Sequence, residues 1–324
     1  MDDTIWLICS SVLIPLGVIE NAISVVVLVR QKFQAMPSRL SLICLSINDL
    51  ILLIVGLGRY WLKAVTGRYA ANDIYWLCRL LSYLVIAMSH ISSTIVALIC
   101  IERLAAVVFS HRFPSTYRLQ VIGLYLTFFI CCSLNIHLLF DTELEFDMKT
   151  NSTGCTNSSW KVAIIVDSLD AIFLCFLPLI IIISCNSCII IKLKIVSHKI
   201  TSRLPDSHTT PSSSVRLKNE AQTFGKNNVS KSRITKRDNK VTKTLLFVTM
   251  AFFIFNVPFG VVNFLRTYAS EDNTPSNSWT QAWTVTYLLV YVNNCVNLPI
   301  YAFIHPIFME ELKKIFFSRF SCKF

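Results

Sequence analysis

The amino-acid sequence predicts an all-α membrane protein, a bundle of seven transmembrane helices followed by a short amphipathic eighth helix. Of its 324 residues, 54% are hydrophobic and only 15% are charged, whereas a soluble domain carries about 25% charged residues. Seven apolar runs are each long enough to cross a bilayer core of roughly 30 Å as a helix. These runs are Ile5–Val29, Leu40–Leu57, Cys78–Val108, Leu119–Phe140, Trp160–Ile191, Thr244–Tyr268 and Trp279–Ile304. We therefore expect a bundle over residues 1–304 and a helix with a tail over 305–324.

The distribution of charge predicts how the bundle is oriented. Between Lys192 and Lys243, thirteen Lys or Arg face three acids, a surplus of 13 − 3 = +10 out of a net charge of +11. The first and third connections are also basic, whereas the fourth is acidic. Because basic loops stay on the cytoplasmic side, we predict a multi-pass plasma-membrane protein with its N-terminus outside and its C-terminus inside. The basic segment, disordered over about 197–239, is interpreted as a cytoplasmic loop, and no nucleic-acid partner is expected.

Two cysteines lie at the predicted outer boundary, whereas nine others lie within apolar runs. We predict that this pair, Cys78 and Cys155, forms a disulfide in an oxidising compartment. Glycosylation sequons at Asn151 and Asn157 fall in the same outer connection, which supports the orientation.

The C-terminal segment predicts a helix that lies on the inner leaflet of the lipid bilayer. After Pro306, apolar residues recur at helical intervals, with acids early and lysines one turn later. Cys322 near its end is a candidate for palmitoylation, with an unmodified thiol as the alternative.

Polar side chains within the predicted spans mark candidate functional positions, because they are costly in hydrocarbon. A lone carboxylate there, Asp49, must be protonated, paired or bound to a cation. The other polar side chains expected around it are Asn21, Ser92, Asn293 and Asn297. We predict an oxygen-rich cluster that suits a sodium ion with water, or a proton, and we expect no required cofactor. A purely structural hydrogen-bond network is the alternative.

An adjacent acid and base, Glu102 and Arg103, stand near the end of the third span. Arg103 follows Cys78 by twenty-five residues, roughly 37 Å of helix, so the two lie at opposite membrane faces. Asp238 precedes Pro258 by twenty residues, which places it at the inner end of the sixth span. We predict a latch in which Arg103 alternates between Glu102, Asp238 and a partner, broken when the sixth span swings outward about Pro258. An Arg that only reaches the membrane surface is the alternative.

In this order and spacing, the motifs resemble those of the rhodopsin-like (class A) G-protein-coupled receptors. The resemblance covers all seven spans and the tail helix. It implies an extracellular ligand, a heterotrimeric G protein as partner, coupling through Glu102-Arg103-Leu104, and no enzymatic activity. The other residues and motifs on which the resemblance rests are Asn21, the run Leu45–Leu50, the pair Cys78 and Cys155, and Asn297-Leu298-Pro299-Ile300-Tyr301.

The family's activation relay would use proline kinks and aromatic residues of the fifth to seventh spans, here Pro178, Phe252, Asn256, Pro258 and Tyr301. Three positions of the fifth to seventh spans depart from the family pattern. Asn256 replaces the family's Trp two residues before the proline, with Phe252 or Phe255 as a substitute, and Pro299 stands one place late. A helix-five Tyr is replaced by Asn186.

The outer ends of the spans offer charges of both signs among aromatic residues, which suit a peptide or an anionic ligand. The candidate ligand residues are Arg59, Asp170, Arg266, Trp283 and Tyr287, together with Lys63. Amine receptors of the family carry an acid eighteen residues before the helix-three Arg, where this chain has Val85. The run Asn135-Ile-His137-Leu-Leu-Phe and the acid-rich second outer loop are similar to those of invertebrate neuropeptide receptors, which predicts a peptide ligand. A chemosensory receptor for small molecules is the alternative. A transporter or channel is a less favoured alternative, because it would need internal repeats or charged, broken helices, which the sequence lacks.

Overall fold

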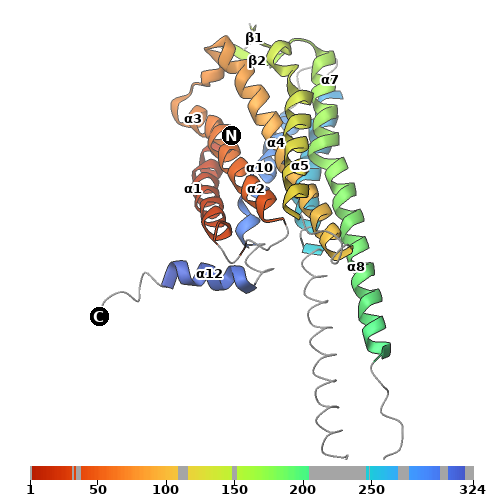
Figure 1. Cartoon of the computed structure of the whole chain (residues 1–324). Coiled ribbons are helices and arrows are strands. Elements are labelled where there is room, and N and C mark those ends of the chain that lie inside the picture. Colours follow the sequence, from red (N-terminus) through yellow and green to blue (C-terminus); the bar gives the residue numbers. More distant parts are fainter. Residues whose placement is uncertain are drawn as a thin grey trace, which may run out of the picture.

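Seven long helices run side by side in the part of the chain that the computed structural model describes (Figure 1). This part comprises residues 2–30, 33, 38–108, 116–147, 152–203, 246–247, 249–268, 277–299 and 306–317. Six helical segments within it are long and apolar enough to cross a membrane, and α10 (Asn277–Cys295) is a seventh, more polar helix. The predicted seven-helix bundle is confirmed. The predictions for Asp238, Tyr301, Asn151 and Cys322 concern residues outside the described part.

The first four spans follow the predicted runs, and each begins one to three residues earlier than predicted. The first is α1 (Asp2–Leu28), and the second joins α2 (Arg39–Ile51), a π-helical segment (Leu52–Leu57) and α3 (Gly58–Thr66). A 3-10 turn (Ala70–Asn72) leads to α4 (Tyr75–Val108). The fourth span is α5 (Thr116–Asn135), extended by the single turn α6 (Leu138–Asp141).

The later spans contain two local departures from a regular α-helix. The fifth joins α7 (Trp160–Leu169), a π-helical segment (Asp170–Phe176) and α8 (Leu177–Arg203), and the sixth is Thr249–Tyr268. The seventh, predicted as Trp279–Ile304, instead ends as α10 at Cys295, bends at Val296 and resumes over 297–299. Pro299 explains the break, because it has no N–H to donate to the carbonyl of Cys295.

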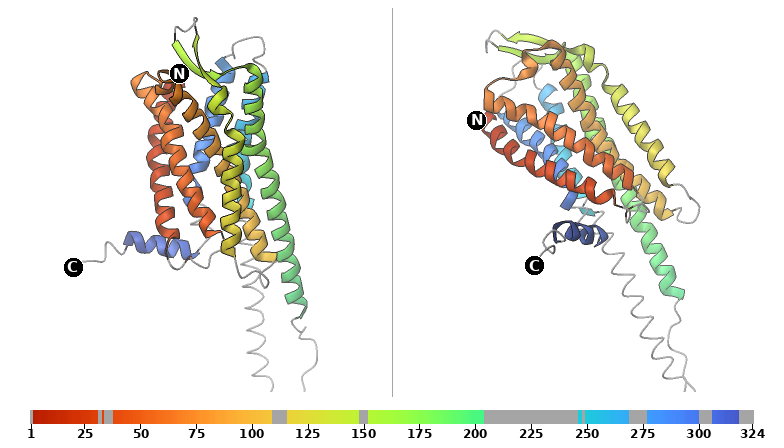
Figure 2. Two further views of the ribbon diagram at one scale, coloured as in Figure 1. Left: turned by 45° about the horizontal axis from the view of Figure 1, so that its top comes forward. Right: turned by 60° about the vertical axis from the view of Figure 1, so that its left-hand side comes forward.

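A β-hairpin covers one end of the bundle (Figure 2). Its strands β1 (Thr142–Asp147) and β2 (Ser152–Asn157) pair antiparallel, with Leu144 opposite Cys155. The charge pattern of this segment predicts an acidic connection but no hairpin. The sequence does contain a pattern typical of a β-strand here, because Leu144 and Phe146 alternate with acidic residues at a period of two. We call this end of the bundle the disulfide end.

The helix α12 (Pro306–Phe317) lies crosswise at the opposite end of the bundle, near the end of α1 (Figures 1 and 2). Arg30, just after α1, forms an ion pair of 3.0 Å with Glu311 of α12. Phe308 is buried, and its ring centroid lies 6.0 Å from that of Phe33. An apolar contact and an ion pair therefore both connect α12 to the bundle.

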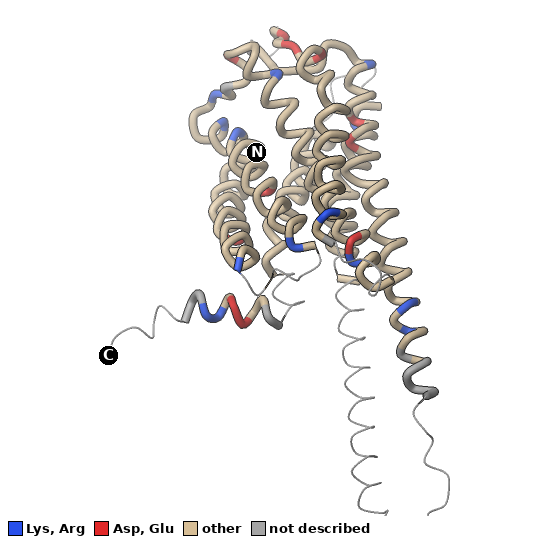
Figure 3. Tube along the Cα trace, in the orientation of Figure 1, with Lys and Arg blue, Asp and Glu red and all other residues tan. Residues whose placement is uncertain are grey.

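Charged residues gather toward the two ends of the bundle, and the middle is almost free of them (Figure 3). Large apolar side chains point outward along the helices; Ile8, Val12 and Ile19 of α1 are all exposed. Buried apolar residues such as Leu45 and Ile95 fill the interior. An apolar exterior around an apolar interior is the arrangement that a lipid environment requires.

Candidate functional site

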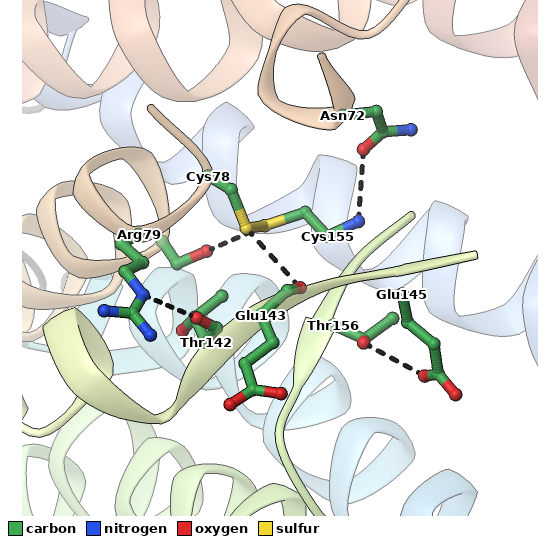
Figure 4. Close-up of a disulfide and its surroundings, with 9 residues drawn as sticks. Asn72, Cys78, Arg79, Thr142, Glu143, Glu145, Cys155 and Thr156 are labelled. Atoms are coloured by element: carbon green, nitrogen blue, oxygen red, sulfur yellow. Dashed lines mark hydrogen bonds between the residues drawn. A yellow bond between two sulfur atoms is a disulfide. The ribbon is translucent and has the colours of Figure 1, made fainter. Parts of the chain in front are cut away.

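A disulfide joins α4 to the hairpin at the disulfide end (Figure 4). Cys78 and Cys155 are linked as predicted; their Cα atoms lie 5.7 Å apart, and their sequence separation is 77. The Asn72 side chain accepts a hydrogen bond of 3.1 Å from the Cys155 backbone N–H, and Arg79 Nε donates to the Thr142 carbonyl at 2.9 Å. The hairpin is thereby fixed in position over the bundle.

Below the hairpin lies a cavity of about 550 Å³. Its walls come from α3 and the connection that follows it, α4, α6, β2, the fifth span, the helix Thr249–Tyr268 and α10. Its lining includes all of the candidate ligand residues named from the sequence, which are Arg59, Lys63, Asp170, Arg266, Trp283 and Tyr287. Segments far apart in sequence therefore contribute to one chamber, of the volume that small-molecule sites have.

Arg59 lies among tyrosines on one wall of this cavity. Its guanidinium carbon is 4.8 Å from the ring centroid of Tyr60 and 6.0 Å from that of Tyr69. The guanidinium also donates long hydrogen bonds to the hydroxyls of Tyr60 (3.3 Å) and Tyr287 (3.4 Å). Burial raises the pKa of Tyr69, which lies in the connection outside the spans, so its hydroxyl remains neutral.

A buried histidine, His90, connects three spans, and one of its partners, Asp170, lines the cavity. His90 Nε2 of α4 lies 2.8 Å from Asp170 Oδ1, and His90 Nδ1 lies 3.0 Å from Asn135 Nδ2. Because an amide nitrogen only donates, and Asn135 Nδ2 also donates to the Cys131 carbonyl, Nδ1 of the imidazole must accept. The Nε2 atom of His90 therefore carries the proton and donates it to Asp170.

Asn263 connects the helix Thr249–Tyr268 to two neighbouring spans. Its Nδ2 donates to Asp167 Oδ1 at 2.7 Å, and its Oδ1 accepts from Trp283 Nε1 at 2.9 Å. Asp167 also accepts a short hydrogen bond from Thr267. The guanidinium of Arg266 lies 5.1 Å from the ring centroid of Trp283. Movement of this helix would disturb the lining of the cavity, because its polar partners lie there.

Asp49 lies fully buried in the middle of the bundle, bonded to two of the predicted residues. Ser92 Oγ donates to Asp49 Oδ1 at 2.7 Å, and Asn297 Nδ2 donates to Oδ2 at 2.6 Å. Asn21 departs from the prediction: its amide donates to the carbonyls of Gly17 and Asn294, so its side chain is committed to linking α1 with α10. Asn293 also forms no hydrogen bond with Asp49 within the described residues.

At the end opposite the disulfide, Glu102 is bonded to α2 and not to Arg103. Glu102 is buried, and its Oε1 accepts a hydrogen bond of 2.7 Å from the Ser41 hydroxyl. No ion pair joins Glu102 to Arg103 among the residues with described placement. The expected Glu102–Arg103 pair is thus replaced by a contact between α2 and α4.

The proline of the fifth span leaves a carbonyl free, which a neighbouring span uses. Pro178 has no N–H to donate to the carbonyl of Leu174, and the Ser93 hydroxyl of α4 donates to that carbonyl at 2.7 Å. The contact joins α4 to the fifth span about one turn before Pro178.

The residues near Pro258 are packed into the bundle. Phe252 is buried with Cys100 of α4 and Ile182 of α8. Asn256, where the family pattern has Trp, is also buried; its side chain donates to the Phe252 carbonyl, and its carbonyl accepts from the Cys175 thiol at 3.1 Å. Asn186 donates to Thr249 at 2.8 Å, linking α8 to the helix Thr249–Tyr268.

Several residues of the site were not identified from the sequence. They are His90, Asn135, Asp167 and Asn263 of the polar networks, and Tyr60 and Tyr69 around Arg59. The first four are polar residues inside apolar spans, so their cost in hydrocarbon could have marked them. Tyr60 directly follows Arg59 in the sequence, but nothing in the sequence marks Tyr69 as a neighbour of Arg59.

Comparisons with known proteins agree with this arrangement. A family model described as "7 transmembrane receptor (rhodopsin family)" matches residues 20–301. The C-C chemokine receptor type 7 of Mus musculus is 36% identical over 83 residues, which cover 24% of this chain and 22% of that protein. The muscarinic acetylcholine receptor M4 of Gallus gallus is 28% identical over 90 residues, which cover 28% of this chain and 17% of that protein. Either match spans less than a quarter of the relative's length.

Proposed function

Because the chain belongs to the rhodopsin family of 7 transmembrane receptors, we propose that it binds an extracellular ligand at its disulfide end and activates a heterotrimeric G protein at the other. The proposed location is the plasma membrane, with the N-terminus outside and the C-terminus in the cytoplasm. The support for this orientation is the basic segment between Lys192 and Lys243 and the acidic hairpin at the disulfide end.

One observation carries the proposal. The cavity below the hairpin is lined by residues of several spans, and one of them is the helix Thr249–Tyr268. The opposite end of this helix adjoins α8 through Asn186 and Thr249. A ligand that changes the contacts of this helix in the cavity can therefore bias two arrangements of the helix as a whole. Pro258 lies between the two regions and supplies the hinge.

We propose that outward movement of this helix exposes the surface that the G protein recognises, with Arg103 as the coupling residue. Ser41 holds Glu102 by a hydrogen bond, which leaves the guanidinium of Arg103 available to a partner. In the proposed mechanism Asp238 pairs with Arg103 in the inactive arrangement, as the sequence spacing from Pro258 suggests.

The proposed ligand is a peptide. Supporting features are the charges of both signs in the cavity, Arg59 and Arg266 against Asp167 and Asp170, among the aromatic rings of its lining. The two relatives are named for different ligands, a C-C chemokine and acetylcholine, so they do not decide the ligand class. The volume of about 550 Å³ favours a second candidate, a small molecule in a chemosensory receptor. A peptide would place only one end in the cavity.

We further propose that Asp49 holds a sodium ion as an allosteric ligand. Its carboxylate is fully buried, and no Lys or Arg pairs with it among the described residues. Each of its oxygens accepts one hydrogen bond, and since a carboxylate oxygen has two lone pairs, each can also bind a cation. A protonated Asp49 is the alternative, and it would need no ion.

The experiment that tests the ligand class measures calcium release in cells expressing the chain together with a promiscuous G protein. Tissue extracts containing neuropeptides should activate these cells, and treating the extracts with protease should abolish the response. A response that survives protease and passes through a small-pore filter would assign the chain to small-molecule sensing. Cells with Arg103→Ala at the same surface level serve as the control, because they should bind but not signal.

A further inference from the structure

The guanidinium of Arg59 is a cation in a cavity that supplies it with no anion. Its Nε is buried and has no hydrogen-bond partner among the residues that the structure describes. No carboxylate of the described residues lies within ion-pair distance of it. Arg59 is only partly exposed, and a charge held partly out of water without a counter-ion is unfavourable, which marks it as a candidate ligand contact.

The tyrosines around Arg59 hold the guanidinium in place but do not neutralise its positive charge. The rings of Tyr60 and Tyr69 stabilise the cation by cation–π contact, and the hydroxyls of Tyr60 and Tyr287 accept only long hydrogen bonds from it. The ring of Tyr60 stacks on that of Trp6 at a centroid distance of 4.1 Å. Arg59 is thereby prepositioned at the cavity wall.

The acids of the cavity have other partners. Asp170 accepts hydrogen bonds from His90 and Asn263. Asp167 accepts hydrogen bonds from Asn263 and Thr267. Asp3 pairs with Lys63 at 3.4 Å. Among the described residues, no acid is left to neutralise Arg59, so the neutralising group is expected to arrive with the ligand.

We infer that Arg59, Tyr60, Tyr69 and Tyr287, the Arg59 subsite, bind an anionic oxygen group of the ligand. This inference rests on the proposed function, because it takes the cavity as the ligand site. The fork of N–H donors in a guanidinium matches a planar carboxylate, such as a peptide C-terminus or an acidic side chain. The hydroxyls of Tyr60 and Tyr287 can donate to the same anion while they accept from Arg59, because a hydroxyl has one donor as well as acceptor lone pairs. The subsite thus selects a free acid over the corresponding amide.

The test measures the melting temperature of the purified full chain in lipid nanodiscs. The probes are N-acetylphenylalanine and its amide, which differ in one charge and hardly in size. The acid should raise the melting temperature in a saturable way, and the amide should not. Phenyl phosphate and phenyl sulfate in parallel identify which anion fits best. A shift with any of the three anions supports the subsite; no shift with any of them, or an equal shift with the amide, overturns it.

Two variants connect the effect to Arg59. Arg59→Gln should abolish the shift, whereas Arg68→Gln, an exposed residue outside the cavity, should preserve it. Without a probe, Arg59→Gln should melt no lower than the wild type, because it removes an uncompensated charge. A purely structural arginine would give the opposite sign. Arg59→Lys keeps the positive charge but lacks the paired N–H donors of the guanidinium, so it should retain a smaller shift in melting temperature. If both Arg59 variants fail to fold, Arg59 is structural and the inference is wrong.

Signalling separates this inference from the proposed function. If peptide extracts activate wild type and Arg59→Gln equally, the receptor function stands and the Arg59 subsite fails. If the acid binds through Arg59 but the chain never accelerates GTP loading, the subsite stands and the receptor function fails.

Discussion

The hydroxyl of Ser41 donates a hydrogen bond of 2.7 Å to Oε1 of Glu102, joining α2 to α4 at the end opposite the disulfide. Glu102 is buried, and its second oxygen has no partner among the described residues. The Ser41 contact is therefore the one described hydrogen bond that this carboxyl group makes. It also keeps the side chain of Glu102 directed toward α2, away from pairing with Arg103.

Removing this contact should destabilise the bundle. Ser41→Ala leaves a buried acid without a partner, at a cost of about 1–3 kcal/mol in the free energy of unfolding. Thermal unfolding of the purified chain measures the effect. Ser46→Ala on the same helix is the control, because the Ser46 hydroxyl is buried without a described partner and its loss should be neutral or favourable. Equal melting temperatures for Ser41→Ala and wild type would show that the contact is unimportant.

The Asn263 contacts should restrain the helix Thr249–Tyr268. Asn263→Ala removes its hydrogen bonds to Asp167 and Trp283, and so loosens the helix at the cavity. We expect basal nucleotide exchange to rise about fivefold or more, since a coupling of about 1 kcal/mol suffices for that change. The exchange assay needs no ligand. Gln281→Ala, exposed on α10, should leave the rate unchanged; a rate for Asn263→Ala equal to that of the control would argue against the restraint.

The Asp49 site should make the receptor sensitive to sodium. Replacing sodium by N-methylglucamine at constant ionic strength should lower the melting temperature of the wild type, because an ion that binds the folded state stabilises it. Asp49→Asn should remove this dependence, since the amide lacks the charge that attracts the ion. The exposed Asp3→Asn should retain it. A wild type that ignores sodium would favour the protonated alternative for Asp49.

The disulfide should be required for a receptor that reaches the cell surface. Cys78→Ser frees the hairpin from α4 and should cost about 2–5 kcal/mol of stability. Flow cytometry of epitope-tagged cells should then find most of the protein retained inside. Cys9→Ser, at a free cysteine of α1, should reach the surface normally. Wild-type surface levels for Cys78→Ser would contradict a structural role for the bond.

Much of the fold follows from hydropathy alone, because each span must satisfy its backbone polar groups internally whatever its neighbours are. The pairing of Cys78 with Cys155 followed from their common position at the outer boundary. Ser92 and Asn297 meet Asp49 because each is a polar group in an apolar span with few alternative partners.

The finer contacts depend on how each helix is rotated, which spacing does not determine. Asn21 and Asn293 illustrate this, since a polar residue at the right depth can still face another neighbour. The π-helical segments Leu52–Leu57 and Asp170–Phe176 widen the helix locally, shifting the residues that follow them, Arg59 among them. Neither segment has a sequence signature that we could read, and the aromatic surroundings of Arg59 were accordingly missed.

The measurement that tests the central claim most directly is GTP loading on a panel of purified heterotrimeric G proteins, with the full chain in nanodiscs and an activating peptide fraction. We expect the wild-type chain to accelerate loading on at least one heterotrimer. Arg103→Ala, at equal peptide binding, should not. Loading that the wild type never accelerates on any heterotrimer, or that Arg103→Ala accelerates equally well, would contradict the account.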